Sequence, residues 1–172
     1  EHMFKTGGVP ALRYGVIKDG ATKGMIAKVR KLAGTMRGKT VGRSLFARLT
    51  LTKYDLGSDL ILAPLIAWAK GLWDNLVQRT ALEQAWTHGM RTVGLITECG
   101  RVYGAAGAAV IAINRLGWTF SRFDSVTTRG GTRLNLGGVS VATLVKHASG
   151  GKYPTILPHK VLGSRSWGAY LT

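Results

Sequence analysis

The first clear helical pattern lies in residues 22–36. Six apolar residues recur there at helical spacing: Met25, Ile26, Val29, Leu32, Ala33 and Met36. The basic residues of the segment fall mostly on the other faces: Lys23, Lys28, Arg30 and Lys31. The pattern predicts an amphipathic helix with a basic surface, closed by Gly38. A short helix opened by Ser44 is expected next, in residues 42–51.

Residues 58–80 form a longer and more apolar segment, which predicts a helix with a broad buried surface. Ser58 is the expected N-cap, and Asp59 then lies in the first turn, where the helix dipole favours a carboxylate. Pro64 either kinks this helix or marks its true start. Thr80 and Glu83 have capping-box spacing, which predicts that a further helix starts with little linker.

The stretch VYGAAGAAVIAINRLGW, residues 102–118, is rich in glycine and alanine. Arg101 and Arg115 bracket only 13 residues, too few to span a bilayer. A phosphate-binding loop is disfavoured, because the glycine spacing is wrong and no Lys-Ser/Thr follows. We therefore expect a closely packed helix at the centre of the domain, ending at Leu116-Gly117.

The sequence DSVTTRGGTRLNL predicts a β-hairpin, with a cationic turn at Gly130-Gly131. Ser140 then caps a last short helix. The predicted fold is mainly α: five or six helices around the small-residue helix, one small hairpin and an extended tail. Residues 1–149 form the domain. Residues 150–172 form the basic tail, which we expect a partner in a large assembly to hold in place.

The net charge of +16, from 24 Lys/Arg and 8 Asp/Glu, indicates what kind of partner the protein binds. Residues 1–57 hold 12 basic and 3 acidic residues, residues 58–118 hold 5 and 4, and residues 119–172 hold 7 and 1. A nearly neutral centre thus lies between two basic flanks. Such an excess favours a polyanion, which leaves RNA, DNA and anionic membrane surfaces as candidates.

Residues with catalytic or metal-binding chemistry are sparse. The eight acids include no paired carboxylates of the kind that hold Mg²⁺, and the four histidines have no metal-ligand spacing. We interpret Cys99 as a plain reduced thiol rather than a nucleophile. Of the five tryptophans, Trp167 in the tail is the best candidate for base stacking. The other four are expected in the core: Trp68, Trp73, Trp86 and Trp118.

Several segments together resemble one family. They are FKTGGVPALRYG (4–15), GRSLFARLTL (42–51), LAPLIAWAKGLWD (62–74), GAAGAAVIAINRLGW with the hairpin TTRGGTRLNL, and VATLVKHAS. Residues 4–149 are similar to the region that follows the palm in LINE-like retrotransposon reverse transcriptases of the dinoflagellate and protist type. The resemblance implies a helical thumb or connector that touches template and primer. The palm Tyr-x-Asp-Asp motif is absent, so polymerase activity is carried over to no residue.

From the sequence we expect a non-catalytic, RNA-binding structural component of a ribonucleoprotein, such as an organellar ribosome. We expect its partners to be structured RNA and neighbouring proteins, without cofactor, metal or small-molecule substrate. The expected location is inside the cell, in an organelle such as the mitochondrion. Two alternatives remain: a reverse-transcriptase fragment, and a protein-interaction subunit of a membrane complex. The predicted nucleic-acid-binding residues are Lys23, Lys28, Arg30, Lys31, Arg37, Lys39, Arg43, Arg129, Arg133, Lys152, Lys160, Arg165 and Trp167.

Overall fold

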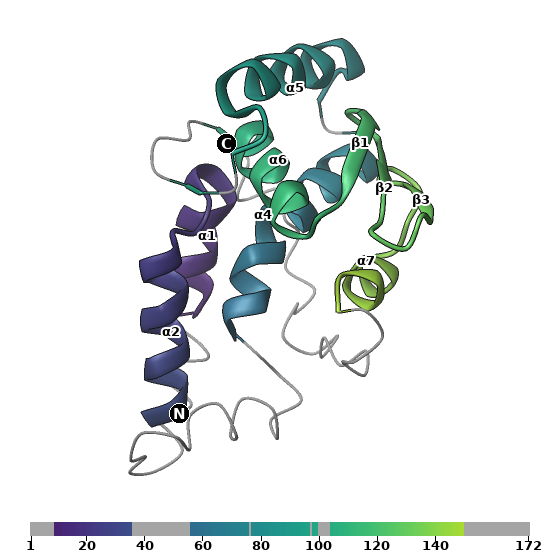
Figure 1. Ribbon diagram of the computed structural model, residues 1–172. Helices are drawn as coiled ribbons and strands as arrows, with labels where there is room; N and C mark the ends of the chain where they lie inside the picture. Colours follow the sequence, from purple (N-terminus) through teal and green to yellow (C-terminus); the bar gives the residue numbers. More distant parts are fainter. Residues whose placement is uncertain (1–8, 36–55, 76, 97, 100–103, 150–172) are drawn as a thin grey trace.

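Helices build most of the protein, with one small antiparallel sheet at its side (Figure 1). The structure is a computed structural model that describes residues 9–35, 56–75, 77–96, 98–99 and 104–149. The described elements are α1 (Val9–Asp19), α2 (Lys23–Thr35), α4 (Leu56–Trp73), α5 (Arg79–Val93), α6 (Ala105–Arg115), β1 (Thr119–Arg122), β2 (Ser125–Thr127), β3 (Arg133–Asn135) and α7 (Val141–Ala148). The predicted mainly α fold is confirmed.

Helix α6 is the centre of the fold, as the small-residue stretch predicts. Every residue from Ala106 to Ile113 is buried. Helices α1, α4 and α5 pack around it (Figure 1). The small side chains permit this, because Gly89 of α5 lies directly against the backbone of Gly107. The helix ends at Arg115 with Leu116 as its C-cap, and Gly117 follows with a φ of 66°, a left-handed conformation that glycine adopts without strain.

Helix α4 joins two hydrophobic clusters. Its first half contributes Leu60 and Ala63 to a cluster with α1 and α2. Its second half contributes Leu65 and Trp68 to the main core around α6. Pro64 separates the two halves, and Figure 1 shows that α4 changes direction part-way along its length. A proline inside a helix removes one backbone hydrogen bond and favours such a bend.

Two predicted helix starts are wrong. Helix α4 begins at Leu56, so Ser58 lies inside its first turn instead of capping it, and Pro64 is internal. Helix α5 begins at Arg79 after Gln78, and no side chain caps it, so Thr80 and Glu83 form no capping box. In both cases the helix begins one or two residues before the polar residue that the pattern selects, a difference that is common at helix ends.

The sheet contains the predicted hairpin and one further strand. Strands β2 and β3 pair antiparallel, with Val126 opposite Leu134, and β1 adds to the other side of β2. The turn between β2 and β3 includes Gly131 with a φ of 82°. Val126 and Leu134 are buried against the core, which leaves the opposite face of the sheet polar.

Three of the four tryptophans expected in the core are buried: Trp68, Trp86 and Trp118. Trp68 donates a hydrogen bond of 2.8 Å from Nε1 to the carbonyl of Phe123, which ties α4 to the sheet. Trp73 is 56% exposed, so its assignment to the core is wrong. It is the last residue of α4, where the chain leaves the packed part of the helix.

The last described helix begins where the sequence predicts. Ser140 precedes α7, and its Oγ accepts a hydrogen bond of 3.1 Å from the backbone N–H of Thr143. Helix α1 is an addition that the periodicity did not predict. The predicted helix in residues 42–51, the closing Gly38 and the tail of residues 150–172 lie outside the described residues.

Candidate nucleic-acid interface

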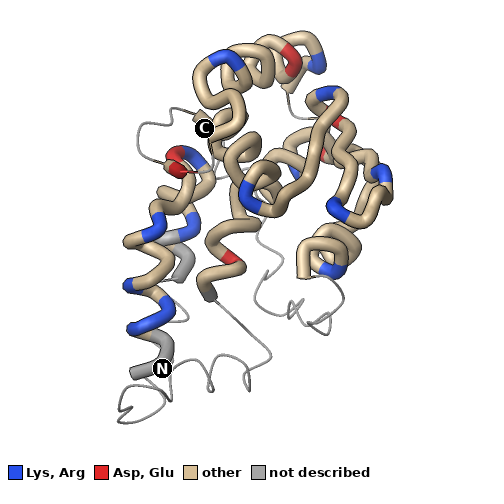
Figure 2. The backbone as a smooth tube through the Cα atoms, viewed as in Figure 1, with Lys and Arg blue, Asp and Glu red and all other residues tan. Residues whose placement is uncertain are grey.

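The predicted binding residues that the structure describes lie in two separate parts of the molecule, on α2 and on the β2–β3 hairpin, and Figure 2 shows further basic residues on α5 and α7. We call Lys23, Lys28 and Lys31 of α2 the α2 lysine surface, and Arg129 and Arg133 at the β2–β3 hairpin the hairpin arginine surface. Figure 2 shows basic residues on α2 at one edge of the molecule and on the hairpin at the other. The structure therefore does not bring the predicted binding residues into one site.

Helical spacing creates the α2 lysine surface. Ile26 and Val29 point into the cluster with α1 and α4, where they are 7% and 6% exposed. Lys23, Lys28 and Lys31 are all exposed on the remaining arc of the helix. Gly24 and Ala27 lie between them and are also exposed. These two small residues leave the lysine ammonium groups accessible to a backbone phosphate, while Leu32, which is 43% exposed, lies on the same helix beside Lys31.

The three lysines differ in their electrostatic surroundings. Lys23 forms an exposed ion pair with Glu98, and this ammonium group lowers the pKa of the Glu98 carboxyl. Lys28 and Lys31 form no ion pair with any acid in the described part of the chain. Exposed pairs are weak and screened by salt, so Lys23 can exchange Glu98 for another anion at little cost.

Arg30 is placed differently from the lysines on the same helix. It is half-buried, and its guanidinium lies against Gly57 in the first turn of α4. A Cβ added at Gly57 would be 2.9 Å from Arg30 Cζ. We therefore assign Arg30 to the α2–α4 contact, although the sequence groups it with the nucleic-acid-binding residues.

The hairpin arginine surface combines a turn and a strand. Arg129 lies exposed in the turn, and Arg133 begins β3. Arg133 Nε donates a hydrogen bond of 3.0 Å to Ser125 Oγ across the hairpin. The register places Thr127 opposite Arg133, and Asn135 two residues further along the same face. This face offers guanidinium, hydroxyl and amide groups together, all of which bind phosphate and ribose oxygens.

Sequence reasoning did not single out one arginine cluster beside this face. Arg79 at the start of α5 pairs with Asp124, and Arg122 Nε lies 3.6 Å from the same carboxylate. Both guanidinium groups also lie over the Phe123 ring, at 5.1 Å and 6.0 Å from its centroid. The cluster joins α5 to the sheet and is partly neutralised. Its members are far apart in sequence, so no local motif indicates it.

Six of the thirteen predicted binding residues are described by the structure, as given above. The other seven lie outside the described residues: Arg37, Lys39, Arg43, Lys152, Lys160, Arg165 and Trp167. They keep the status of predictions.

No protein-family model matches the chain, and neither does any curated protein or solved structure. The resemblance to the post-palm region of LINE-like reverse transcriptases therefore stays a prediction. The surfaces described above are the basis for any inference about function.

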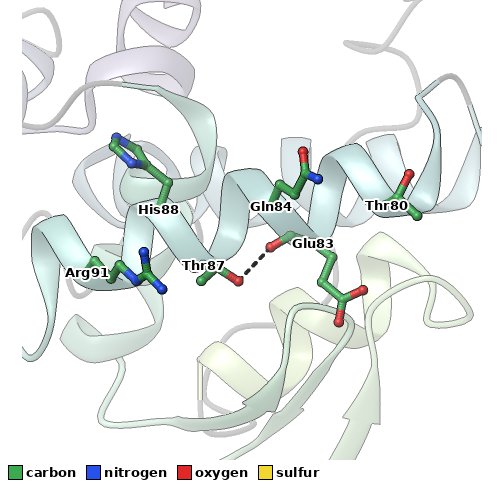
Figure 3. A pocket seen from close by; sticks show the side chains of 6 residues that line it. All are labelled: Thr80, Glu83, Gln84, Thr87, His88 and Arg91. Carbon is green, nitrogen blue, oxygen red and sulfur yellow. Dashed lines mark hydrogen bonds between the residues drawn. The ribbon is translucent and has the colours of Figure 1, made fainter.

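Figure 3 shows a pocket on the outer face of α5. Its lining residues all come from this one helix: Thr80, Glu83, Gln84, Thr87, His88 and Arg91. The Thr87 hydroxyl donates a hydrogen bond of 2.9 Å to the Glu83 backbone carbonyl, which occupies it within the helix. Among the described residues the pocket is thus a stretch of helix surface, to which α5 alone contributes.

Other classes of site find little support among the described residues. No group of three His, Cys, Asp or Glu side chains there is arranged to hold a metal ion. No described helix is both long enough and apolar enough to cross a membrane. Cys99 is a free, buried thiol beneath Gly20, and burial raises its pKa. A raised pKa makes a thiol less reactive at neutral pH, as expected of a structural cysteine.

Proposed function

We propose that this chain is a non-catalytic RNA-binding component of a ribonucleoprotein. Lysine and arginine side chains on its surface neutralise phosphates, and the release of condensed counterions supplies affinity. The shape of the rigid helical body then determines where on a folded RNA it sits. A ribosome of an organelle, such as the mitochondrion, is the assembly in which we expect it.

The exposed lysines of α2 are the observation that most strongly supports this proposal. Lys28 and Lys31 project from the face of α2 that points away from the core, and no acid in the described residues neutralises them. Their neighbours Gly24 and Ala27 have small side chains, which leave the lysine ammonium groups accessible. A solubility role needs no such gathering of one sign of charge, whereas phosphate binding does.

The proposal is tested by titrating a fluorescently labelled structured RNA with the purified full chain. The double variant Lys28→Gln/Lys31→Gln should bind about tenfold more weakly, because each lost phosphate contact removes its share of counterion release. The matched control is Arg91→Gln/Lys146→Gln, which removes the same charge from α5 and α7 and should bind much like the wild type. Equal weakening in both variants, or no RNA binding by the wild type, contradicts the proposal.

The same experiment separates the alternative functions. A reverse-transcriptase connector should prefer a primer–template duplex over a folded RNA of equal length. A membrane-complex subunit should associate with vesicles of anionic lipid in a flotation assay without nucleic acid. The proposed function predicts that folded RNA is bound best and that vesicles compete poorly.

A further inference from the structure

The two basic surfaces lie at the two different halves of α4. The α2 lysine surface rests on the first half, through the contacts of Ile26 and Val29 with Leu60 and Ala63. The sheet that contains the hairpin packs on the second half of α4, where Trp68 Nε1 donates a hydrogen bond to the carbonyl of Phe123 in the β1–β2 turn. Helix α4 has 18 residues, which corresponds to about 27 Å of helix axis.

The core lies between these surfaces, so they face away from each other. Helix α2 turns its lysines away from α4, because its apolar face packs on α4. The sheet turns Val126 and Leu134 toward the core and its polar face outward. A short RNA duplex lying on one surface would therefore leave the other surface open to solvent.

The chemistry of the two surfaces also differs. The α2 lysine surface presents flexible ammonium groups among small residues, which bind phosphates as point charges without a fixed geometry. The hairpin arginine surface presents guanidinium groups beside Thr127 and Asn135. Arginine can bind a phosphate with two parallel hydrogen bonds, and hydroxyl and amide groups can reach ribose oxygens. The hairpin should thus be the more geometrically selective of the two.

We propose that the chain bridges two separate RNA segments, with one held on the α2 lysine surface and the other on the hairpin arginine surface. This inference rests on the proposed RNA-binding function and adds that the protein is bivalent as a monomer. Because the body between the surfaces is packed, it would fix the distance and direction between the two segments. A bridging role of this kind stabilises a folded RNA without any catalytic step.

The test uses two short RNA hairpins of unrelated sequence, one immobilised and one fluorescent. Full-length wild-type protein should capture the fluorescent hairpin on the immobilised one. Capture should pass through a maximum and fall again when protein is in excess, because each RNA then carries its own protein. Sedimentation measures whether the protein is monomeric under the same conditions, since a dimer could bridge through one surface only.

Two variants assign the surfaces. Lys28→Gln/Lys31→Gln and Arg129→Gln/Arg133→Gln should each still bind a single hairpin but lose capture of the second by about tenfold. The control Arg91→Gln/Lys146→Gln should capture as the wild type does. Since Arg133 also bonds Ser125, the variant Arg129→Gln alone, which should lower capture by a smaller factor, guards against local unfolding of the hairpin.

The outcomes distinguish the two levels of the proposal. A wild-type protein that binds one hairpin but captures no second one at any ratio overturns bridging and leaves RNA binding intact. A protein that binds neither hairpin overturns the proposed function as well. Capture that persists in either surface variant, or that appears only with protein dimers, also overturns bridging by these two surfaces.

Discussion

Gly89 of α5 lies so close to Gly107 of α6 that a Cβ added at residue 89 would be 2.9 Å from the Gly107 backbone nitrogen. The same Cβ would be 3.1 Å from the carbonyl carbon of Ala106. Backbone atoms cannot rotate away as a flexible side chain can, so one of the helices would have to move. This contact sets the distance between α5 and the central helix.

The substitution Gly89→Ala should therefore destabilise the protein by about 1–2 kcal/mol, because overpacking outweighs the gain in helix propensity. Urea unfolding followed by circular dichroism measures the change. Gly71→Ala in α4 is the matched control, since its added Cβ meets no other element within 4 Å in the described part of the chain. It should be neutral or stabilising by up to about 1 kcal/mol. Equal effects of the two substitutions would show that the α5–α6 contact is looser than described.

The cap of α7 supplies a second prediction. Ser140→Ala removes the hydroxyl that accepts from the Thr143 N–H and should cost about 1 kcal/mol of unfolding free energy. Ser149→Ala at the other end of the helix removes an exposed hydroxyl that donates to the Lys146 carbonyl. Its effect should be smaller, because the carbonyl remains accessible to water. A larger cost at Ser149 than at Ser140 would argue against the cap.

The buried thiol makes stability depend on alkaline pH. Burial raises the pKa of Cys99 in the folded chain above its unfolded value of about 8.5. The neutral buried thiol therefore contributes fully to the free energy of unfolding below that pH. This contribution is lost as the pH rises toward the folded pKa, because the thiol then ionises readily only in the unfolded chain. Between about pH 8 and pH 10, the urea midpoint of the wild type should fall more steeply than that of Cys99→Ala. Parallel pH profiles would show that the thiol is solvated in the folded protein.

Local patterns predicted most of the fold but less of the detail. The run from Ala105 to Ile113 carries no charge and is rich in alanine, and it forms most of the buried central helix. Ser140 caps its helix as predicted, because the polar residue stands alone before an apolar run. Ser58 does not cap α4, because that helix already begins at Leu56, and the exact first residue of a helix is the part that a sequence pattern fixes least. Trp73 is exposed because α4 has left the core at its last residue. Helical periodicity alone does not show where a helix leaves the core.

The candidate interface was predictable only in part. The lysines of α2 are visible as a basic arc on an amphipathic helix, and their exposure is confirmed. Arg30 lies on the same helix, but its packing on Gly57 depends on a residue 27 positions away in sequence. The pairing of Arg79 with Asp124 joins residues 45 apart. Such contacts arise from the tertiary fold, so a single sequence does not reveal which cations are already engaged.

The salt dependence of RNA binding tests the central claim most directly. The logarithm of the association constant, plotted against the logarithm of salt concentration, should be linear with a steep negative slope. For Lys28→Gln/Lys31→Gln the slope should be shallower by about two on duplex RNA, one for each lost phosphate contact, while Arg91→Gln/Lys146→Gln should keep the wild-type slope. A wild-type slope near zero, or the same slope in all three proteins, would contradict the assignment of these lysines to an RNA phosphate backbone.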